Sequence, residues 1–395
     1  MTPRASMLAA MRGTPGGRTV FAPRMDLWAI ALRARGTLPA EYDGTNTAEL
    51  ADAFGVGCHA VRADYTLPRD PGDLVLRGLG LDNHPDYPFR VEIEGLEVRF
   101  ETTEEGFSTT VTTSSGPVDW SLAYTAGMAR AGVSLPFVES YPAYDAGDLD
   151  RLAEVFEHLV VRPAPGSWER FSERVGKRGV AVANGCIVGS PMHLLLHELM
   201  PIDRFFYAYH DEYDRLAAFA ERVEPFFERM LAAVAASPAE VVLWGGNYDR
   251  DVTWPPFFDS EIAPWLRRVG AVLGEAGKVL LCHTDGENEG LTEGYVRAGF
   301  DVAESVCPAP MTGVALGSLR ERMGPAICIW GGVPSVMLLR DSVSDADFDS
   351  WLARLAVESA RTDDDLSPLI LGVSDNVPPD ADLDRLRAIA DAFRP

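Results

Sequence analysis

The amino-acid sequence predicts a parallel α/β protein, and two patterns carry that prediction. Eight short runs rich in Val, Ile and Leu recur along the 395 residues, and helical patterns lie between most of them. The apolar residues within each run are continuous, which is typical of strands buried on both faces of a parallel sheet. The runs cover residues 19–24, 55–65, 179–185, 240–247, 278–283, 300–306, 326–332 and 368–375.

The segments between the runs carry apolar residues at spacings of three and four, which predicts amphipathic helices. Such segments are 209–236, 259–276, 287–298, 313–323 and 344–361. In the last of them Ser344 is followed three residues later by Asp347, which resembles a capping box at a helix start. Eight strands alternating with helices fit a TIM (β/α)8 barrel, and a doubly wound open sheet is the structural alternative.

One segment, 88–124, departs from this rhythm because apolar and polar residues alternate in it. Val91, Ile93 and Phe100 belong to its apolar set, and glutamates separate them. Strict alternation with a turn at 104–106 predicts an antiparallel β-hairpin or small sheet. We expect a single barrel domain over 1–395, with this hairpin inserted after the second strand and its acidic side facing water.

The composition excludes several classes of protein. Acidic residues number 59 and basic residues 35, for a formal charge of −24, which argues against nucleic acids and anionic membrane surfaces as partners. No apolar run reaches the roughly 18 residues of a membrane span, and the N-terminal segment lacks the pattern of a signal peptide. The five cysteines never form a CxxC pair, so we expect reduced thiols and a cytoplasmic location.

Polar side chains gather at the ends of the predicted strands, where a barrel places its functional residues. Loop starts and helix caps account for part of such a set. The strand ends offer Arg24, Asp26, Arg62, Asp64, Asn184, Asn247, Asp249, His283, Asp285, Glu304, Cys307, Asp375 and Asn376.

The most suggestive of these strand ends is His283-Thr-Asp285. Residues two apart in an extended chain point to the same side, so this imidazole and carboxylate would enter the barrel mouth together. Zinc accepts such a pair at roughly 2.0–2.2 Å, and a third ligand would come from another strand end. Candidates for that ligand are Asp375, Glu304 and Cys307. The alternative is that Asp285 only orients His283 or caps a helix.

Arg24 and Asp26 share a side by the same period-two argument. They would hold a substrate carboxylate or a polar ring substituent, with Arg24 as a two-pronged donor. The alternative is a local ion pair at the rim. His193 and His197 lie four apart on a predicted helix, but no glutamate follows the first histidine as in the zinc protease motif, so we expect both to be structural.

At these residues the chain resembles the uroporphyrinogen decarboxylase superfamily, over nearly its full length and in order. The similar stretches are FAPRMDLWAIALRARGTLPAEY, WGGNYD with PPFFDSEIAPWLRR, LLCHTDG, AESVCPAPMTGVALGSLRERMGPAICIWGGVP and LILGVSDNVPPDADLDRLRAI. The resemblance implies a TIM barrel, in agreement with the strand count. It also implies one of two chemistries: decarboxylation of porphyrinogen acetates without a cofactor, or methyl transfer with corrinoid proteins, usually assisted by zinc.

The resemblance is nearer to the methyltransferase branch, the O-demethylases included. Porphyrinogen decarboxylases present several arginines near the first strand, whereas Asp26 follows Arg24 here. The coenzyme M methyltransferases bind their metal with His-x-Cys and a further Cys at the end of the last strand. This chain has His283, Asp285 and Asp375 by position, so oxygen replaces sulfur twice. Such a site would bind zinc or another divalent ion. The alternative is that it binds no metal, and that Asp285 and Asp375 act as acid, base or hydrogen-bond acceptors.

The function expected from these residues is methyl transfer from a small methyl ether or amine to a corrinoid protein. His283, Asp285 and Asp375 would hold the metal, with Cys307 as an alternative ligand, and Asp285, Asp375 and Glu304 would be catalytic. Arg24, Asp26, Asn247 and Asp249 would bind substrate. The chain lacks the Asp-x-His-x-x-Gly segment of cobalamin-binding modules, so a partner protein would supply the corrinoid.

Two other functions stay open at this point. One is a metal-free decarboxylase or related lyase, in which Arg24 binds the carboxylate of a small acid and an aspartate protonates the product. The other is a barrel that binds a small ligand without turnover. A homodimer is compatible with each of the three functions.

Overall fold

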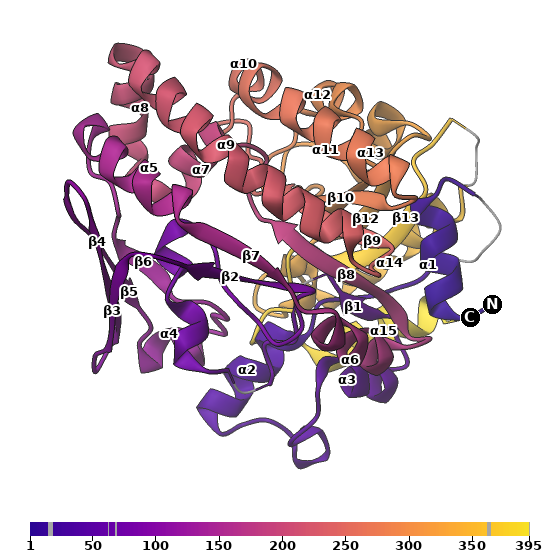
Figure 1. Cartoon of the computed structure of the whole chain (residues 1–395). Helices are drawn as coiled ribbons and strands as arrows, with labels where there is room; N and C mark the ends of the chain where they lie inside the picture. The colour runs from indigo at the N-terminus through magenta and orange to yellow at the C-terminus, as the bar shows by residue number, and fades with distance from the viewer. Residues whose placement is uncertain (15–18, 62, 68, 362–364, 395) are drawn as a thin grey trace.

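The computed structural model describes residues 1–14, 19–61, 63–67, 69–361 and 365–394. Its centre is a seven-stranded parallel sheet that curves into a nearly closed barrel (Figure 1). In sheet order the strands are β1 (Cys58–Ala60), β8 (Gly179–Cys186), β9 (Val241–Gly246), β10 (Val279–His283), β11 (Val302–Val306), β12 (Cys328–Val333) and β13 (Leu369–Val373). All neighbouring pairs run parallel, as the continuous apolar runs predict.

The eighth position of the barrel is held by the segment around Phe21, which forms a single parallel bridge to Leu371. Ala22 N donates to Leu371 O at 2.7 Å on one side, and Gly57 N donates to Phe21 O at 2.7 Å on the other. The segment therefore bonds to β13 and to the chain entering β1. The first predicted strand, 19–24, is reduced to this bridge, and the other seven predicted strands are confirmed.

The barrel interior is packed with the inward-facing side chains of every second strand residue. Val180, Leu243, Leu281 and Val302 belong to this core, and α1 (Pro3–Met11) adds Met7 to it. Arg4 N donates to Lys177 O just before β8 begins, so α1 covers the N-terminal end of the barrel. With that end closed, the mouth at the strand C-termini is left for chemistry.

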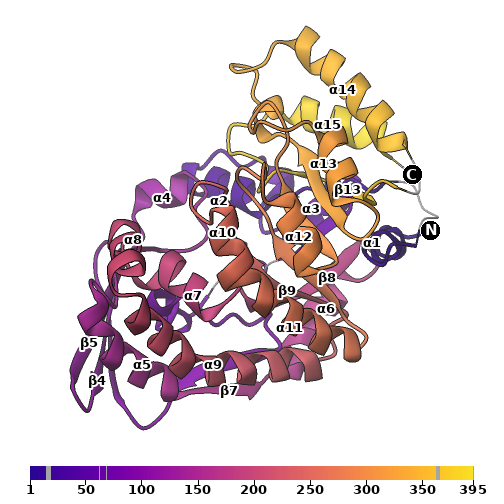
Figure 2. The ribbon, with the colours of Figure 1, turned by 90° about the horizontal axis from the view of Figure 1, so that it is seen from above.

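Helices surround the barrel on the outside (Figures 1 and 2). The longer ones are α2 (Asp26–Arg35), α3 (Thr47–Phe54), α5 (Leu149–Glu157), α6 (Pro165–Val175), α8 (Ile202–Asp211), α9 (Tyr213–Ala236), α11 (Ala263–Glu275), α12 (Thr292–Ala298), α13 (Leu316–Met323), α14 (Asp345–Ala360) and α15 (Leu383–Ala392). Shorter helices are α4 (Ala126–Arg130), α7 (Pro191–Leu194) and α10 (Pro255–Phe257). No helix in the described ranges is both long enough and apolar enough to cross a membrane.

The predicted helices lie where the spacing placed them, with differences at their ends. The segment 209–236 is divided at Glu212 between α8 and α9. Ser344 caps α14 by accepting a hydrogen bond from Asp347 N, as the capping pattern predicts. Two π-helical turns, Leu195–Leu199 and Phe258–Ile262, follow the third and fourth barrel strands β8 and β9 and were not predicted.

The segment 88–124 does not close on itself as the predicted hairpin. Its first strand, β2 (Phe89–Ile93), pairs instead with β7 (Leu159–Pro163), and its side chains Phe89 and Val91 are buried. The remaining strands, β3 (Glu97–Thr102), β4 (Gly106–Thr113) and β5 (Gly116–Ala123), form an antiparallel sheet that gains a fourth strand, β6 (Phe137–Ser140). This sheet stands at the side of the molecule away from α1 (Figure 1).

Candidate functional site at the barrel mouth

Unusual backbone geometry marks the strand C-termini. Asn247, Ser305 and Asp375 adopt left-handed conformations with φ of 56°, 66° and 56°. Register shifts interrupt three strand pairs near the same ends, β8 with β9, β9 with β10 and β11 with β12. Backbone strain and bulges of this kind gather at functional sites because they redirect side chains there.

The central feature of the mouth is a carboxylate held between two histidines. Glu304 on β11 places Oε2 2.6 Å from Nδ1 of His283 on β10, and Oε1 2.9 Å from Nε2 of His59 on β1. His283 and Glu304 are direct neighbours in the β10–β11 register, and both are almost fully buried. Trp330 lies against the His59 ring at 4.8 Å between centroids. Inward-facing positions of three strands thus build one His59–Glu304–His283 unit.

Electrostatics keep the middle of this unit ionised. Burial alone would raise the pKa of Glu304, but the adjacent imidazoles of His283 and His59 outweigh it and hold the pKa far below its usual range. The other nitrogen of His283, Nε2, lies 3.6 Å from Asp285 Oδ1. That separation exceeds the length of a hydrogen bond, so no hydrogen bond joins these two atoms.

Arg24 is held beside this unit by two aspartates. Its guanidinium donates to both oxygens of Asp26, at 2.8 and 3.1 Å, and to Asp375 Oδ1 at 3.3 Å. Desolvation would lower the pKa of Arg24, but Asp26, Asp375 and Glu304 raise it further than desolvation lowers it. The period-two prediction brings Arg24 and Asp26 together correctly. The contact is an ion pair within the protein, so the cation is already neutralised.

Two of the four predicted metal ligands meet at one point. The ligand atoms of a tetrahedral zinc lie about 3.3 Å apart, close to the separation of His283 Nε2 and Asp285 Oδ1. Glu304 behind His283 supplies the outer carboxylate that orients metal-bound imidazoles. However, Asp375 faces Arg24, and no group of three His, Cys, Asp or Glu side chains suited to a metal occurs among the described residues. The arrangement therefore does not fit a zinc centre with three protein ligands.

The remaining predicted residues have other surroundings. Asp249 is tied into the loops, since Oδ2 accepts from Glu287 N and Oδ1 from Asp251 N. Cys307 is buried, and burial raises the pKa of its thiol. Asp64 accepts hydrogen bonds from Thr47 and Thr66, and Arg62 lies outside the described residues.

A second network of hydrogen-bonded polar side chains was missed by reasoning from the sequence. Asn247 Nδ2 lies 2.7 Å from His197 Nε2, and His197 Nδ1 lies 2.7 Å from Glu198 Oε1. Glu198 Oε2 in turn accepts from Arg77 at 2.6 Å. Burial would raise the pKa of Glu198, but Arg77 and His197 lower it to about 2. His197, which we expected to be structural, therefore belongs to this second polar network.

Of the residues that sequence reasoning missed, His59 could have been predicted from the sequence, whereas the contact of His197 could not. His59 interrupts an apolar strand run, and its inward direction follows from the strand period, so an imidazole in the barrel was foreseeable. The partnership of His197 with Asn247 depends on a π-helical turn that no local pattern announces. π-Helical turns are rare and often occur at functional sites.

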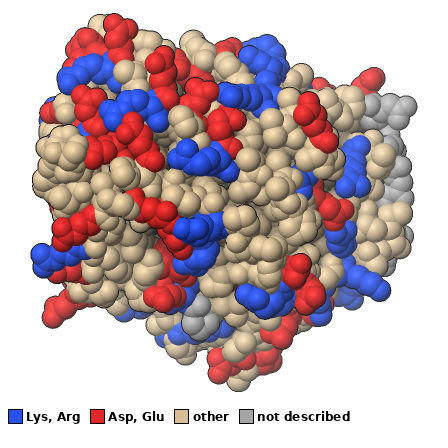
Figure 3. All heavy atoms as spheres, viewed as in Figure 1, with Lys and Arg blue, Asp and Glu red and all other residues tan. Residues whose placement is uncertain are grey.

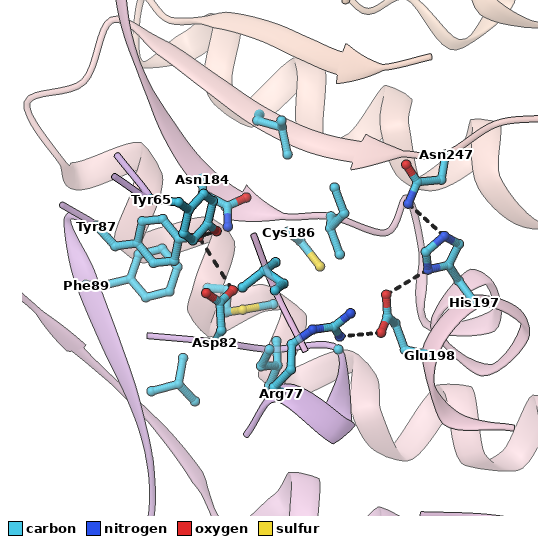
Figure 4. A pocket seen from close by; sticks show the side chains of 18 residues that line it. Tyr65, Arg77, Asp82, Tyr87, Phe89, Asn184, Cys186, His197, Glu198 and Asn247 are labelled. Carbon is cyan, nitrogen blue, oxygen red and sulfur yellow. Dashed lines mark hydrogen bonds and ion pairs between the residues drawn. The ribbon is translucent and has the colours of Figure 1, made fainter. Parts of the chain in front are cut away.

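The second polar network lines one side of a cavity of about 120 Å³ (Figure 4). Tyr65, Tyr87 and Phe89 line the opposite side, and Asn184 and Cys186 come from the end of β8. Burial raises the pKa of Cys186 to about 12, so its thiol is neutral. One residue of the cavity lining is joined to the His59–Glu304–His283 unit, because Asn247 N donates to His283 O at 2.8 Å.

Comparisons with known proteins bear on the fold. No family model matches the chain, and no curated protein matches its sequence. Among solved structures, a methyltransferase from Methanosarcina mazei is similar, with a TM-score of 0.54 and 15% sequence identity. The match covers 100% of this chain and 98% of that one. At this identity the likeness establishes the fold alone, and the family remains a resemblance.

Proposed function

We propose that this protein is a methyltransferase that moves a methyl group from a small methyl ether to a corrinoid held by a partner protein. The observation that carries the proposal is the His59–Glu304–His283 unit, which holds an imidazole nitrogen at the mouth of the barrel. The likeness of the whole chain to a methyltransferase structure supports the same choice.

An ether oxygen needs a proton as it loses its methyl group, because an alkoxide or phenolate is a poor leaving group. His283 is placed to supply that proton. Its Nδ1 is bonded to Glu304, and the carboxylate stabilises the imidazolium form. As the carbon–oxygen bond breaks, the proton on Nε2 passes to the oxygen and the ring becomes neutral. The corrinoid would supply the acceptor for the methyl group. A quaternary amine leaves without a proton, so this geometry favours an ether donor.

The surroundings of Arg24 favour methyl transfer over the alternative decarboxylase. A decarboxylase would use Arg24 to bind the substrate carboxylate, but Asp26 and Asp375 already occupy its donors. With Asp285 and Glu304 nearby, the mouth carries more negative than positive charge. An anionic substrate would be repelled there.

The test is methyl transfer to free cob(I)alamin, followed by the absorbance change that accompanies its methylation. Methyl ethers, methylated amines and small carboxylic acids are offered to the wild type, to His283→Gln and to His210→Gln. His210 is an exposed histidine with its own aspartate neighbour and serves as the matched control. We expect turnover of an ether that falls about 100-fold in His283→Gln only. Release of CO2 without methyl transfer would support the decarboxylase instead.

Zinc or another divalent metal remains a prediction from the sequence. Two converging donors bind zinc weakly, so we expect less than one zinc per chain after dialysis against a weak chelator. Elemental analysis of the wild type and His283→Ala measures this. Near-stoichiometric zinc that is lost in the variant would mean that Asp375 or Cys307 moves to complete the site.

A further inference from the structure

We propose that the cavity beside β8 and β9 is a binding site for a neutral molecule with a single aromatic ring and a hydroxyl group. The inference rests on the cavity alone, so it stands or falls separately from methyl transfer. Three properties carry it: the aromatic wall, the pairing of all charges that line it, and two amides directed at it.

The wall and the size indicate an aromatic ring. Tyr65, Tyr87 and Phe89 form one side of the cavity, and Leu135 adds an apolar contact (Figure 4). Tyr65 and Tyr87 contact each other through their hydroxyls at 3.2 Å, which fixes the wall. A cavity of about 150 Å³ lined by Leu, Ile and Phe accepts benzene, and this one, at about 120 Å³, is of the same order of size. Ring faces and edges attract a further aromatic ring.

The charges that line the cavity are neutralised in place. Arg77 is bonded to Glu198, and Asp82 accepts from Arg69 at 3.1 Å. Neither an anion nor a cation would find an unpaired counter-charge in the described lining, although either would lose its hydration on entry. A neutral ligand avoids this penalty.

Two amides provide the hydrogen bonds for a hydroxyl. Asn184 makes no side-chain hydrogen bond to any other described residue, and it lies at the aromatic side of the cavity in Figure 4. On the other side, ionised Glu198 accepts the proton on Nδ1 of His197, so Nε2 accepts from Asn247 Nδ2. The oxygen of Asn247 is left as an acceptor. Its polarity is increased by the chain of bonds that ends at Arg77.

The test is isothermal titration calorimetry with four probes of similar size: phenol, benzoate, phenyltrimethylammonium and cyclohexanol. We expect phenol to bind at least about tenfold more tightly than the other three. Equal binding of benzoate or phenyltrimethylammonium would overturn the neutral site, and equal binding of cyclohexanol would overturn the aromatic one. No heat of binding with phenol at millimolar concentration would mean that the cavity holds only water.

Variants locate the binding. Asn184→Ala removes an amide with no other described partner, so its fold should be intact by circular dichroism, and phenol binding should weaken about tenfold. Tyr87→Leu tests the wall independently, and His210→Gln is the control that should bind as the wild type does. Unchanged binding in both Asn184→Ala and Tyr87→Leu would place the phenol elsewhere and contradict the proposal.

Discussion

Glu304 differs in kind from the many ion pairs at the surface of this protein. Its side chain is 4% exposed and contacts two imidazoles, whereas the surface pair Arg99–Glu101 has side chains that are 74% and 53% exposed. Exposed pairs contribute little to stability, while removal of one partner of a buried pair costs about 3–5 kcal/mol. Individual side chains at the mouth therefore combine structural and chemical roles.

The first prediction at the residue scale concerns the proton on His283. Glu304→Gln removes the carboxylate that stabilises the imidazolium, so the proton is lost at a lower pH. We expect the fall of methyl-transfer rate with rising pH to begin at a lower pH than in the wild type. A pH–rate profile for each protein measures it. An unchanged profile would show that Glu304 does not act on the transferred proton.

The second prediction concerns acid stability and Glu198. Its pKa falls from an ordinary 4.5 to about 2 on folding, so ionised Glu198 stabilises the fold above pH 4.5. This contribution, about 3 kcal/mol by linkage, is lost as the pH falls from 4.5 towards 2. Glu198→Gln should be less stable at pH 7 by up to this amount, and its difference from the wild type should shrink below pH 4.5.

Urea unfolding at several pH values measures this difference. The matched control is Glu240→Gln, because Glu240 is 40% exposed and pairs with Arg4 and Arg12 at the surface. We expect the control to change stability by less than about 1 kcal/mol. A Glu198→Gln deficit that stays constant down to pH 2 would contradict the assignment.

At the scale of elements, the strand ends of the barrel are tied to one another. Ser305, at the end of β11, accepts a hydrogen bond from Asp375 N after β13 at 2.8 Å. Ser374 donates to Val306 O and Val333 O. These bonds hold the left-handed residues Ser305 and Asp375 in place, so this part of the rim is fixed by the sheet and not by loops alone.

The opposite end of the barrel gives a prediction about α1. Met7 is fully buried in the interior core, where α1 packs against β8 and β13. Met7→Ala removes this contact and leaves a cavity, which should lower the free energy of unfolding by about 2–5 kcal/mol. Met311 is 48% exposed, so Met311→Ala should change it by less than about 0.5 kcal/mol. Chemical denaturation measures both, and a cost for Met7→Ala as small as the control's would mean that α1 is not part of the core.

At the scale of the whole molecule, the added antiparallel sheet is packed on the barrel side. Trp120 of β5 is buried against Gly78, so closely that a Cβ atom added at Gly78 would lie 2.1 Å from the indole. The indole Nε1 donates to Val75 O.

The face in Figure 3 mixes acidic and basic side chains, although the chain carries a net charge of −24.

This packing predicts that residues 1–395 unfold as one domain. Differential scanning calorimetry should give a single transition with a calorimetric enthalpy equal to the van't Hoff enthalpy. Trp120→Ala should lower the whole transition without splitting it. Two resolved transitions in the wild type would mean that the antiparallel sheet is an independent unit.

The sequence by itself determined the buried parallel strands and the strand ends that carry the polar residues. Continuous apolar runs specify buried parallel strands, and the two-residue period specifies that Arg24 meets Asp26 and that His283 and Asp285 face the same space. These are local rules of the chain, so they can be derived without knowing which strands are neighbours. The single barrel domain, the metal and the corrinoid remain predictions.

Tertiary structure alone decided which partners these residues have. Glu304 reaches His59 across 245 positions of sequence, and Asp375 reaches Arg24 across 351. The pairing of β2 with β7 and the meeting of His197 with Asn247 likewise depend on elements distant in the chain. Closure of the barrel brings these groups together, and a periodic pattern along one segment holds no information about that closure.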